Sequence, residues 1–473
     1  MIHKYRLNET NFVIDVNSSC VYIVDDIAYR MLDYLDENMT QEFPLNILPN
    51  FKDVQRNKLE ECYRDLYELK NSHKLFSKDI SGLLSSAKKD LPIKSLCLNV
   101  AHDCNLRCKY CFASTGGFGQ KRSLMSFEVG KKAIDFLIKN SGHRCNLEVD
   151  FFGGEPLMNF DVISKIVEYS REIEKEFKKN FRFTITTNGL LLNSEKIDFI
   201  NQEMSNVVLS LDGRQAINDN LRVMTSGESS YNKILPLFKE LVDKRSSDKS
   251  YYVRGTFTKH NLDFTEDVLH LANLGFKYIS VEPVVCKEGL NYSINDSDIA
   301  QIKNEYEKLF EIMIKRHGTD SEFSFFHFFV DLDMGPCAIK RTRGCGSGNE
   351  YICVTPEGDI YPCHQFVGKN KWKMGNLLNK ILIKNIKTIF SEIDVNLKDD
   401  CKNCFAKFHC TGGCNANNLE YGGSLLKVHK IFCALQKKRL ECAVALQSLK
   451  KLSNNCEYKS FLKSANTHKA YCE

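Results

Sequence analysis

The chain has 473 residues, of which 43% are hydrophobic and 26% are charged, and its formal net charge is +5. This composition is that of a soluble globular protein with room for about three domains, and the near balance of 65 basic and 60 acidic residues argues against a nucleic-acid partner. No apolar run approaches the length of a membrane-spanning helix and no signal peptide is recognised, so we expect a cytoplasmic protein without a membrane partner.

The chain carries 20 cysteines. Disulfides are rare in the reducing cytoplasm, so clustered cysteines there indicate metal binding. Cysteines that stand alone in the sequence, such as Cys62, Cys97 and Cys145, are expected to be buried apolar side chains.

Residues 1–90 are predicted to form a small α+β module. Residues 11–16 and 20–25 are rich in β-branched side chains and flank a turn, which predicts a hairpin. Apolar residues recur at three- and four-residue intervals within residues 53–76, which predicts a packed helix. The polar stretch 77–92 is typical of a linker. A structural cap and a peptide-recognition element both remain open for this module.

Residues 91–310 alternate between strand-like and helix-like stretches. We predict strands at residues 95–101, 146–152, 181–187, 206–212, 251–258 and 277–285. Six β/α repeats with apolar strands predict a parallel sheet, either curled as part of a barrel or open and doubly wound.

Distinctive short motifs follow five of these strands. They are the triplet Cys104, Cys108 and Cys111, then "GGEP" (Gly153 to Pro156), "TNG" (Thr187 to Gly189), "SLDG" (Ser210 to Gly213) and "VEP" (Val281 to Pro283). Active sites in barrels lie at the carboxyl ends of strands, so we expect these motifs to share one pocket.

The cysteine triplet has the spacing C-x3-C-x2-C. A disulfide needs an even number of thiols, and structural metal sites normally have four ligands. Three thiolates leave one iron of a cluster without a protein ligand, and that position can take a substrate or cofactor. The triplet therefore indicates chemistry at the metal.

After a bridging segment, residues 311–335, the region 336–450 is rich in cysteine. Cys345 and Cys363 flank Gly358, a C-x2-C-x5-C-x3-C cluster follows, and a further cysteine stands alone; the last five are Cys401, Cys404, Cys410, Cys414 and Cys433. For the four-cysteine cluster alone, a zinc ribbon and an iron–sulfur site remain open. The basic, polar tail 451–473 is expected to be a solvated face or a frayed end.

The triplet, with Tyr110 directly before its last cysteine, resembles the radical S-adenosylmethionine (SAM) superfamily, as do "GGEP" and "SLDG". The resemblance implies that Cys104, Cys108 and Cys111 hold a 4Fe–4S cluster whose open iron chelates SAM. By position, Gly153, Gly154 and Glu155 would meet the methionyl ammonium, and Ser210 and Arg222 would serve the carboxylate or ribose. Tyr110 is included among the cofactor-binding residues. No catalytic residue is assigned.

Residues 336–450 resemble the SPASM extension of peptide-modifying members of that superfamily. The resemblance implies two auxiliary 4Fe–4S clusters, which makes three clusters in all. The outer one would be held by Cys401, Cys404, Cys410 and Cys433, and the inner one by Cys345, Cys363 and Cys414. Whether Cys337 is a fourth inner ligand remains open.

The N-terminal module resembles the leader-peptide recognition element of enzymes that modify ribosomally made peptides, in which the leader adds a strand to a sheet edge. The order of domains is similar to that of maturases of the Cys-rich SCIFF peptides, which form thioethers between a cysteine sulfur and a carbon of another residue. The implied fold is α/β: a partial (β/α)6 radical-SAM barrel with an N-terminal winged-helix-like module and a C-terminal SPASM domain. The implied partners are a Cys-rich precursor peptide with a leader and an electron donor such as flavodoxin or ferredoxin, in an anaerobic bacterium.

Two alternatives remain. An anaerobic sulfatase maturase would keep the clusters and make formylglycine, but such enzymes carry an acidic residue at the position of His364. A histidine there could accept a proton or simply pack beside a cluster. A non-catalytic iron–sulfur or zinc protein for electron relay would require four ligands at every site, and it explains neither the triplet nor "GGEP".

Overall fold

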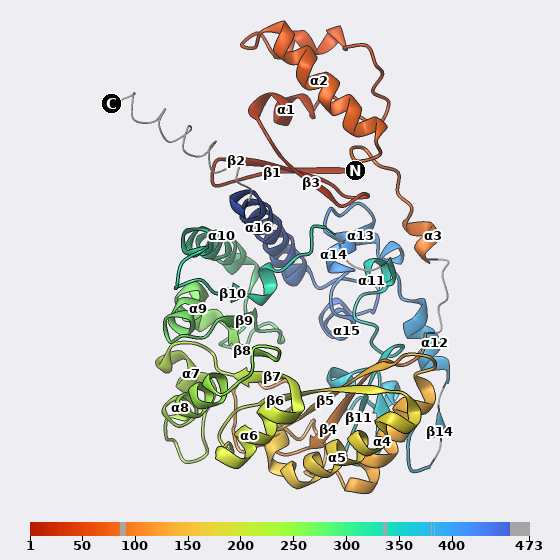
Figure 1. Ribbon diagram of the computed structural model, residues 1–473, viewed down its shortest axis with the longest axis vertical. Helices are drawn as coiled ribbons and strands as arrows, with labels where there is room; N and C mark the ends of the chain where they lie inside the picture. The colour runs from red at the N-terminus through yellow and green to blue at the C-terminus, as the bar shows by residue number, and fades with distance from the viewer. Residues whose placement is uncertain (86–90, 334–337, 380, 383, 455–473) are drawn as a thin grey trace.

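The computed structural model describes residues 1–85, 91–333, 338–379, 381–382 and 384–454 (Figure 1). Cys337 and nearly all of the tail 451–473 lie outside the described residues. An N-terminal module, a large central sheet with its helices and a cysteine-rich region follow one another along the chain (Figure 1).

The N-terminal module is a three-stranded antiparallel sheet with helices on one side. Its strands β1 (Ile2–Leu7), β2 (Thr10–Asp15) and β3 (Cys20–Val24) are arranged in the order β1-β2-β3. The hairpin β2–β3 confirms the prediction, whereas β1 was not predicted because its sequence is polar and lacks a clear alternation. The helices are α1 (Asp26–Met31) and α2 (Arg56–Asn71).

The two faces of this sheet belong to different cores. Val13 faces α1 and α2 and packs with Met31 and Leu59 in a core of the module's own. Phe12 and Ile14 alternate with Val13 and belong to the main core of the molecule. The module is therefore built into the rest of the protein through one face of its sheet.

Helix α16 (Lys430–Asn454) lies beneath that face (Figure 1). The Tyr5 hydroxyl donates to the Glu441 backbone oxygen at 2.9 Å, and His3 Nε2 lies 3.0 Å from Glu441 Oε1. The His3 ring stacks on Phe405 with a centroid distance of 3.5 Å. Polar contacts and ring stacking thus join the module to the C-terminal region.

The central sheet contains the six predicted parallel strands. They are β4 (Ser95–Ala101), β5 (Asn146–Gly153), β6 (Asn180–Thr187), β7 (Met204–Ser210), β8 (Ser250–Phe257) and β9 (Tyr278–Pro283). The connecting helices include α4 (Phe127–Asn140), α5 (Phe160–Phe177), α6 (Ser194–Glu203), α7 (Gln215–Leu221), α8 (Ser230–Asp243), α9 (Phe264–Asn273) and α10 (Ile299–Arg316). The partial (β/α)6 barrel is confirmed, and α10 runs across the expected boundary at residue 310.

Strand β5 buries one set of alternate side chains, whereas every residue of β4 is buried. On β5, Leu147, Val149 and Phe151 are fully buried in the main core, whereas Asp150 and Phe152 on the other face are only partly buried. The carboxylate of Asp150 therefore lies on the face of β5 that does not carry these apolar side chains.

The cysteine-rich region continues the same sheet. Strand β11 (Tyr351–Val354) pairs in parallel with β4, with Cys353 opposite Cys97. The sheet then extends through three antiparallel strands, β12 (Asp359–Tyr361), β13 (Gly375–Asn376) and β14 (Ile381–Leu382), and at the far edge β10 (Ser324–Phe325) pairs with β9. This eleven-stranded sheet was not predicted.

Short helices surround the cysteines of this region. They are α11 (Ala338–Arg343), α12 (Lys384–Glu392), α13 (Asp399–Lys402), α14 (Lys407–Cys410) and α15 (Asn415–Gly422), while α3 (Ser81–Ser85) lies within the expected linker. Helix α16 packs on α10 and on the turn Phe326–Phe328. None of the helices in the described ranges has the length and apolar character needed to cross a bilayer.

Candidate functional site

The cysteine triplet lies in the loop between β4 and α4. The Arg107 and Lys109 backbone N–H groups donate to the Val223 and Leu221 carbonyls, each at 2.9 Å. This pairing holds the loop against the segment after α7. The structure brings the three thiols together. A charge on Cys111 is close enough to raise the pKa of both Cys104 and Cys108. Burial raises the pKa of Cys104 to about 11 and that of Cys108 to about 12.

Gly153 and Gly154 lie where β5 meets the end of β4. A Cβ on Gly153 would lie 2.2 Å from the Ala101 oxygen, and one on Gly154 would lie 2.1 Å from the Asp103 oxygen. Gly153 also has a φ of +127°. Only glycine fits this approach of the two backbones, which brings "GGEP" next to the triplet.

Glu155 is 1% exposed and its carboxylate is already bound by the protein. It accepts from the Thr187 hydroxyl at 2.7 Å, the Asn188 backbone N–H at 2.8 Å and the Leu157 N–H at 3.1 Å. Burial raises its pKa to about 7, against these hydrogen bonds. Glu155 thus fastens "TNG" to "GGEP", and direct contact with a ligand stays a prediction.

The "TNG" motif also reaches the triplet. The Asn188 side-chain amide donates to Asn105 Oδ1 at 2.8 Å and lies 3.6 Å from Cys104 Sγ. Three of the five motifs at strand ends are thus joined in one place. Asn188 was not among the predicted site residues, although its motif had been noted.

Asp212 links Tyr110 to Arg222. The Tyr110 hydroxyl donates to Asp212 at 2.7 Å, and Arg222 Nη2 forms an ion pair with it at 3.0 Å. Arg222 Nε is buried without a hydrogen-bond partner among the described atoms, so the guanidinium keeps a donor for an anionic ligand. Ser210 lies two residues earlier, at the end of β7. Asp212 belongs to "SLDG", but the prediction chose Ser210 and missed it.

The thiols of the cysteine-rich region form two sets. Cys401 experiences the charges of Cys404, Cys410 and Cys433, and burial raises its pKa to about 12. Cys363 experiences those of Cys345 and Cys414. These groups coincide with the predicted outer and inner ligand sets, whereas the ligand roles stay predictions.

All described cysteines are free thiols. Among the described residues, no three His, Cys, Asp or Glu side chains converge closely enough to hold a single metal ion. Buried thiols whose charges repel one another need a cation when they ionise. Sets made of thiols alone have the donor chemistry that iron–sulfur clusters use, in which each thiolate binds a different iron.

The cysteines that stand alone only partly match the prediction. Cys145 is exposed and Cys62 is half-buried, so the expectation of buried apolar side chains was wrong for Cys145. Cys97 is buried, but its neighbours are polar. Interactions with Cys353 and His364 lower the pKa of its thiol, although burial alone would raise that pKa. Local sequence could not show these neighbours, since β4 ends at Ala101 and β11 begins only at Tyr351.

His364 packs between aromatic rings on this side of the sheet. Its ring centroid lies 4.7 Å from that of Phe152 and 5.6 Å from that of Phe112. Its Nδ1 lies 3.3 Å from the Tyr351 hydroxyl. Both interpretations of His364, packing and proton acceptance, remain compatible with this position.

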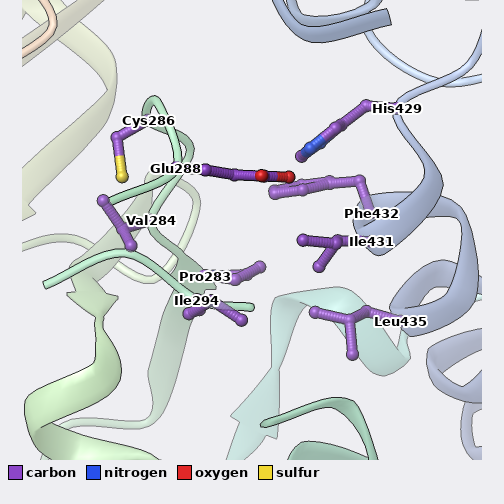
Figure 2. Close-up of a pocket in the computed structure, with 9 residues that line it drawn as sticks. All are labelled: Pro283, Val284, Cys286, Glu288, Ile294, His429, Ile431, Phe432 and Leu435. Carbon is purple, nitrogen blue, oxygen red and sulfur yellow. The ribbon is translucent and has the colours of Figure 1, made fainter. Parts of the chain in front are cut away.

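A small, mainly apolar pocket lies where the end of β9 meets the start of α16 (Figure 2). Its lining comes from both regions: Pro283, Val284, Cys286, Glu288 and Ile294 on one side, and His429, Ile431, Phe432 and Leu435 on the other. His429 Nδ1 is buried and has no hydrogen-bond partner among the described atoms. The last of the five motifs, "VEP", therefore faces the cysteine-rich region.

Comparison with families and relatives agrees with this architecture. Residues 98–272 match the model described as the Radical SAM superfamily, and residues 345–405 match that of an iron–sulfur cluster-binding domain, SPASM. A cysteine-type anaerobic sulfatase-maturating enzyme of Clostridium novyi is 25% identical over 333 residues, covering 67% of this chain and 86% of that protein. The antilisterial bacteriocin subtilosin biosynthesis protein AlbA of Bacillus subtilis is 23% identical over 388 residues, covering 76% and 78%.

Solved structures share the fold. The structure of anSMEcpe with bound AdoMet has a TM-score of 0.63 at 20% identity and covers 79% of this chain and 98% of its own. Streptococcus suis SuiB bound to precursor peptide SuiA has a TM-score of 0.53 at 16% identity and covers 90% and 97%. These likenesses show that the chain shares the fold of these two proteins.

Proposed function

We propose that this chain, a member of the radical SAM superfamily with a SPASM domain, installs thioether cross-links in a ribosomally made, Cys-rich precursor peptide of the SCIFF type. Each cross-link would join a cysteine sulfur to a carbon of another residue, with a net loss of two hydrogen atoms from the peptide. The observation that carries the proposal is an N-terminal sheet with an open edge, β3, on a chain whose thiols form three sets.

Cys104, Cys108 and Cys111 would hold the SAM-binding cluster at the carboxyl ends of the strands. When bound, the cluster and SAM supply a 5′-deoxyadenosyl radical, which takes a hydrogen atom from the peptide. Arg222, fixed by Asp212, offers its free donor to the carboxylate of SAM. Backbone carbonyls near Gly153 and Gly154 offer acceptors to the ammonium group.

The SPASM thiols would hold two further 4Fe–4S clusters. The outer set of four, Cys401, Cys404, Cys410 and Cys433, is complete. The inner set of Cys345, Cys363 and Cys414 leaves a place for the cysteine of the peptide, with Cys337 as the competing fourth ligand. Binding there would position the substrate thiol and favour its ionised form.

The N-terminal sheet would bind the leader of the precursor. Among the described residues β3 pairs only with β2, so its outer edge can accept a strand through backbone hydrogen bonds. A groove lined by Phe405, Cys433 and Glu441 lies close by, between α10 and α16. SuiB bound to SuiA matches 90% of this chain, which supports a peptide partner.

Formylglycine formation is the second candidate function. The Clostridium novyi relative favours it, because that protein is a cysteine-type anaerobic sulfatase-maturating enzyme and the match covers 86% of its length. His364, at the position of the acidic residue in such enzymes, weighs against it. The match to anSMEcpe also covers only 79% of this chain.

The test uses anaerobically purified protein with SAM and a precursor peptide encoded beside the gene. Dithionite or a reduced flavodoxin supplies electrons. We expect 5′-deoxyadenosine and a peptide that has lost two hydrogen atoms per cross-link and resists alkylation at the linked cysteine. A sulfatase-derived peptide that instead acquires an aldehyde would establish the second candidate.

A variant with Cys104, Cys108 and Cys111 all changed to Ala is the matched control. It should form no 5′-deoxyadenosine while iron remains in the SPASM region. Undiminished cleavage of SAM by this variant would remove the basis of the proposal.

A further inference from the structure

Lys398 is a buried lysine in the SPASM region. It follows the turn Val395–Leu397, directly before α13, and is 1% exposed. Its Nζ donates to the Gly412 carbonyl at 2.9 Å and lies 3.5 Å from the Thr411 carbonyl. The charges that act on Lys398 include those of cysteine thiols.

These thiols belong to both sets. Lys398 experiences the charges of Cys401 and Cys410 from the outer set and of Cys345 and Cys414 from the inner set. Thr411 and Gly412, which hold its ammonium group, lie in the short segment between Cys410 and Cys414. The lysine therefore lies where the two sets adjoin.

The chain leaves space for this side chain. A Cβ at position 412 would lie 2.4 Å from Lys398 Cδ, and Gly412 has a φ of +77°. The glycine in "CTGGC" thus admits the stem of the lysine while its carbonyl binds the ammonium. This part of the chain therefore accommodates the stem and the ammonium group of one lysine.

Among the described residues, the hydrogen-bond partners of this ammonium group are two carbonyls. Burying it is costly, since such dipoles replace the lost hydration poorly. An anionic neighbour would offset that cost. The thiols that act on Lys398 are candidates for this neighbour, because they become anionic when they bind iron.

We propose that Lys398 is the shared counter-charge of the two auxiliary clusters and raises the reduction potential of both. The inference rests on the proposed function, because it requires clusters in both thiol sets. Each 4Fe–4S cluster accepts one electron from the external reductant, and a fixed positive charge stabilises the reduced form. Net charge and hydrogen bonding near the sulfurs are established determinants of cluster potential.

The test measures the potentials without the SAM cluster. Lys398→Met is made in the Cys104, Cys108 and Cys111 to Ala background, reconstituted anaerobically, and titrated with dithionite and mediators under electron paramagnetic resonance. At a fixed potential we expect the ratio of reduced to oxidised cluster to fall about tenfold for both clusters, equivalent to about 59 mV for a one-electron couple.

Two variants serve as controls. Lys398→Arg keeps the charge and should retain potentials near those of the parent. Lys407 is 2% exposed in the same region but pairs with Asp79 at 2.6 Å, so Lys407→Met should leave both potentials unchanged. Lys398→Met with full iron content and unchanged potentials would overturn the inference.

Iron content separates the remaining outcomes. A parent protein that binds no iron in the SPASM region would contradict the proposed function itself. If Lys398→Met loses iron, the Lys398→Arg variant provides the test. Clusters that are retained in Lys398→Arg with the potentials of the parent support the role of the positive charge. Loss of iron from Lys398→Arg as well would contradict that role.

Discussion

The Asp212 carboxylate is fully buried and accepts hydrogen bonds from three elements. The Tyr110 hydroxyl comes from the cysteine loop, Arg222 from the segment after α7, and the Thr256 N–H at 2.9 Å from β8. The pKa of Tyr110 is raised, first by burial and further by the charge of Asp212. One carboxylate thus fixes the cysteine loop, Arg222 and a strand of the barrel.

Asp212→Asn should therefore destabilise the protein. Removing one partner of a buried ion pair leaves the Arg222 charge uncompensated, at a cost of about 3–5 kcal/mol in the free energy of unfolding. Denaturant unfolding of the apoprotein measures the change. Tyr110→Phe is the control, because it removes one hydrogen bond to the same carboxylate and should cost about 1 kcal/mol. Equal stability of Asp212→Asn and the parent would contradict this account.

Asp150 provides a test by pH. It lies beside Cys97 and Thr184 on the sheet, and burial raises its pKa from 3.8 to about 7. The folded protein therefore holds this proton more tightly than the unfolded chain. Stability from this group is fully present below about pH 4 and is lost as the pH rises through about 7.

The expected loss is about 2–3 kcal/mol, discounted for the partial exposure of the side chain. Asp150→Asn should remove this part of the pH dependence between about pH 4 and 8. Asp320→Asn, at an exposed turn, should leave the pH profile unchanged. Thermal unfolding across that range is the measurement, and an identical slope in Asp150→Asn and the parent would refute the assignment.

At the scale of elements, the N-terminal sheet connects two cores. Deleting residues 1–90 would uncover the face of α16 that contacts β1, so point substitutions test the module better than truncation. Phe12 is fully buried on the face shared with the main core. Met31 is fully buried in the module's own core.

Phe12→Ala should lower the free energy of unfolding by about 3–5 kcal/mol through the cavity it leaves. It should also speed hydrogen exchange in α16 near Glu441. Met31→Ala should speed exchange in α1 and α2 but leave α16 protected. If Phe12→Ala leaves hydrogen exchange in α16 unchanged, the N-terminal module is a separate unit.

Strand β11 shows a second link between elements. It protects the edge of β4, which would otherwise present unpaired backbone groups next to the cysteine loop. The same pairing brings Cys353 and His364 to Cys97. The cysteine-rich region is thus part of the sheet that carries the cysteine loop and "GGEP".

At the scale of the whole molecule, three thiol sets lie within one continuous architecture. The barrel supplies the first set in the loop that follows β4. The extended sheet and the helices beyond it supply the other two, with Lys398 between them. Helix α16 carries Cys433 of the outer set and also the contacts of Glu441 with the N-terminal sheet, so the peptide-binding element proposed here adjoins the outer set.

The sequence by itself determined the six parallel strands and the grouping of cysteines into sets. Buried parallel strands are encoded by local apolar runs, and the triplet and the SPASM cysteines are short-range spacings. Strand β1 and the four-residue β11 were missed because their local patterns are weak. The module's hairpin was correctly predicted, since its turn and strands are adjacent in the chain.

Only the tertiary structure decided which residues partner across the fold. It joined Glu155 to Thr187, Asp212 to Arg222, Cys97 to Cys353 and Lys398 to the segment between two cysteine sets. Most of these partners are far apart in sequence, and no local sequence pattern identifies any of the pairs. Their contacts depend on sheet register and burial. Local periodicity specifies elements, whereas the cost of burying charge without a partner specifies which side chains must meet.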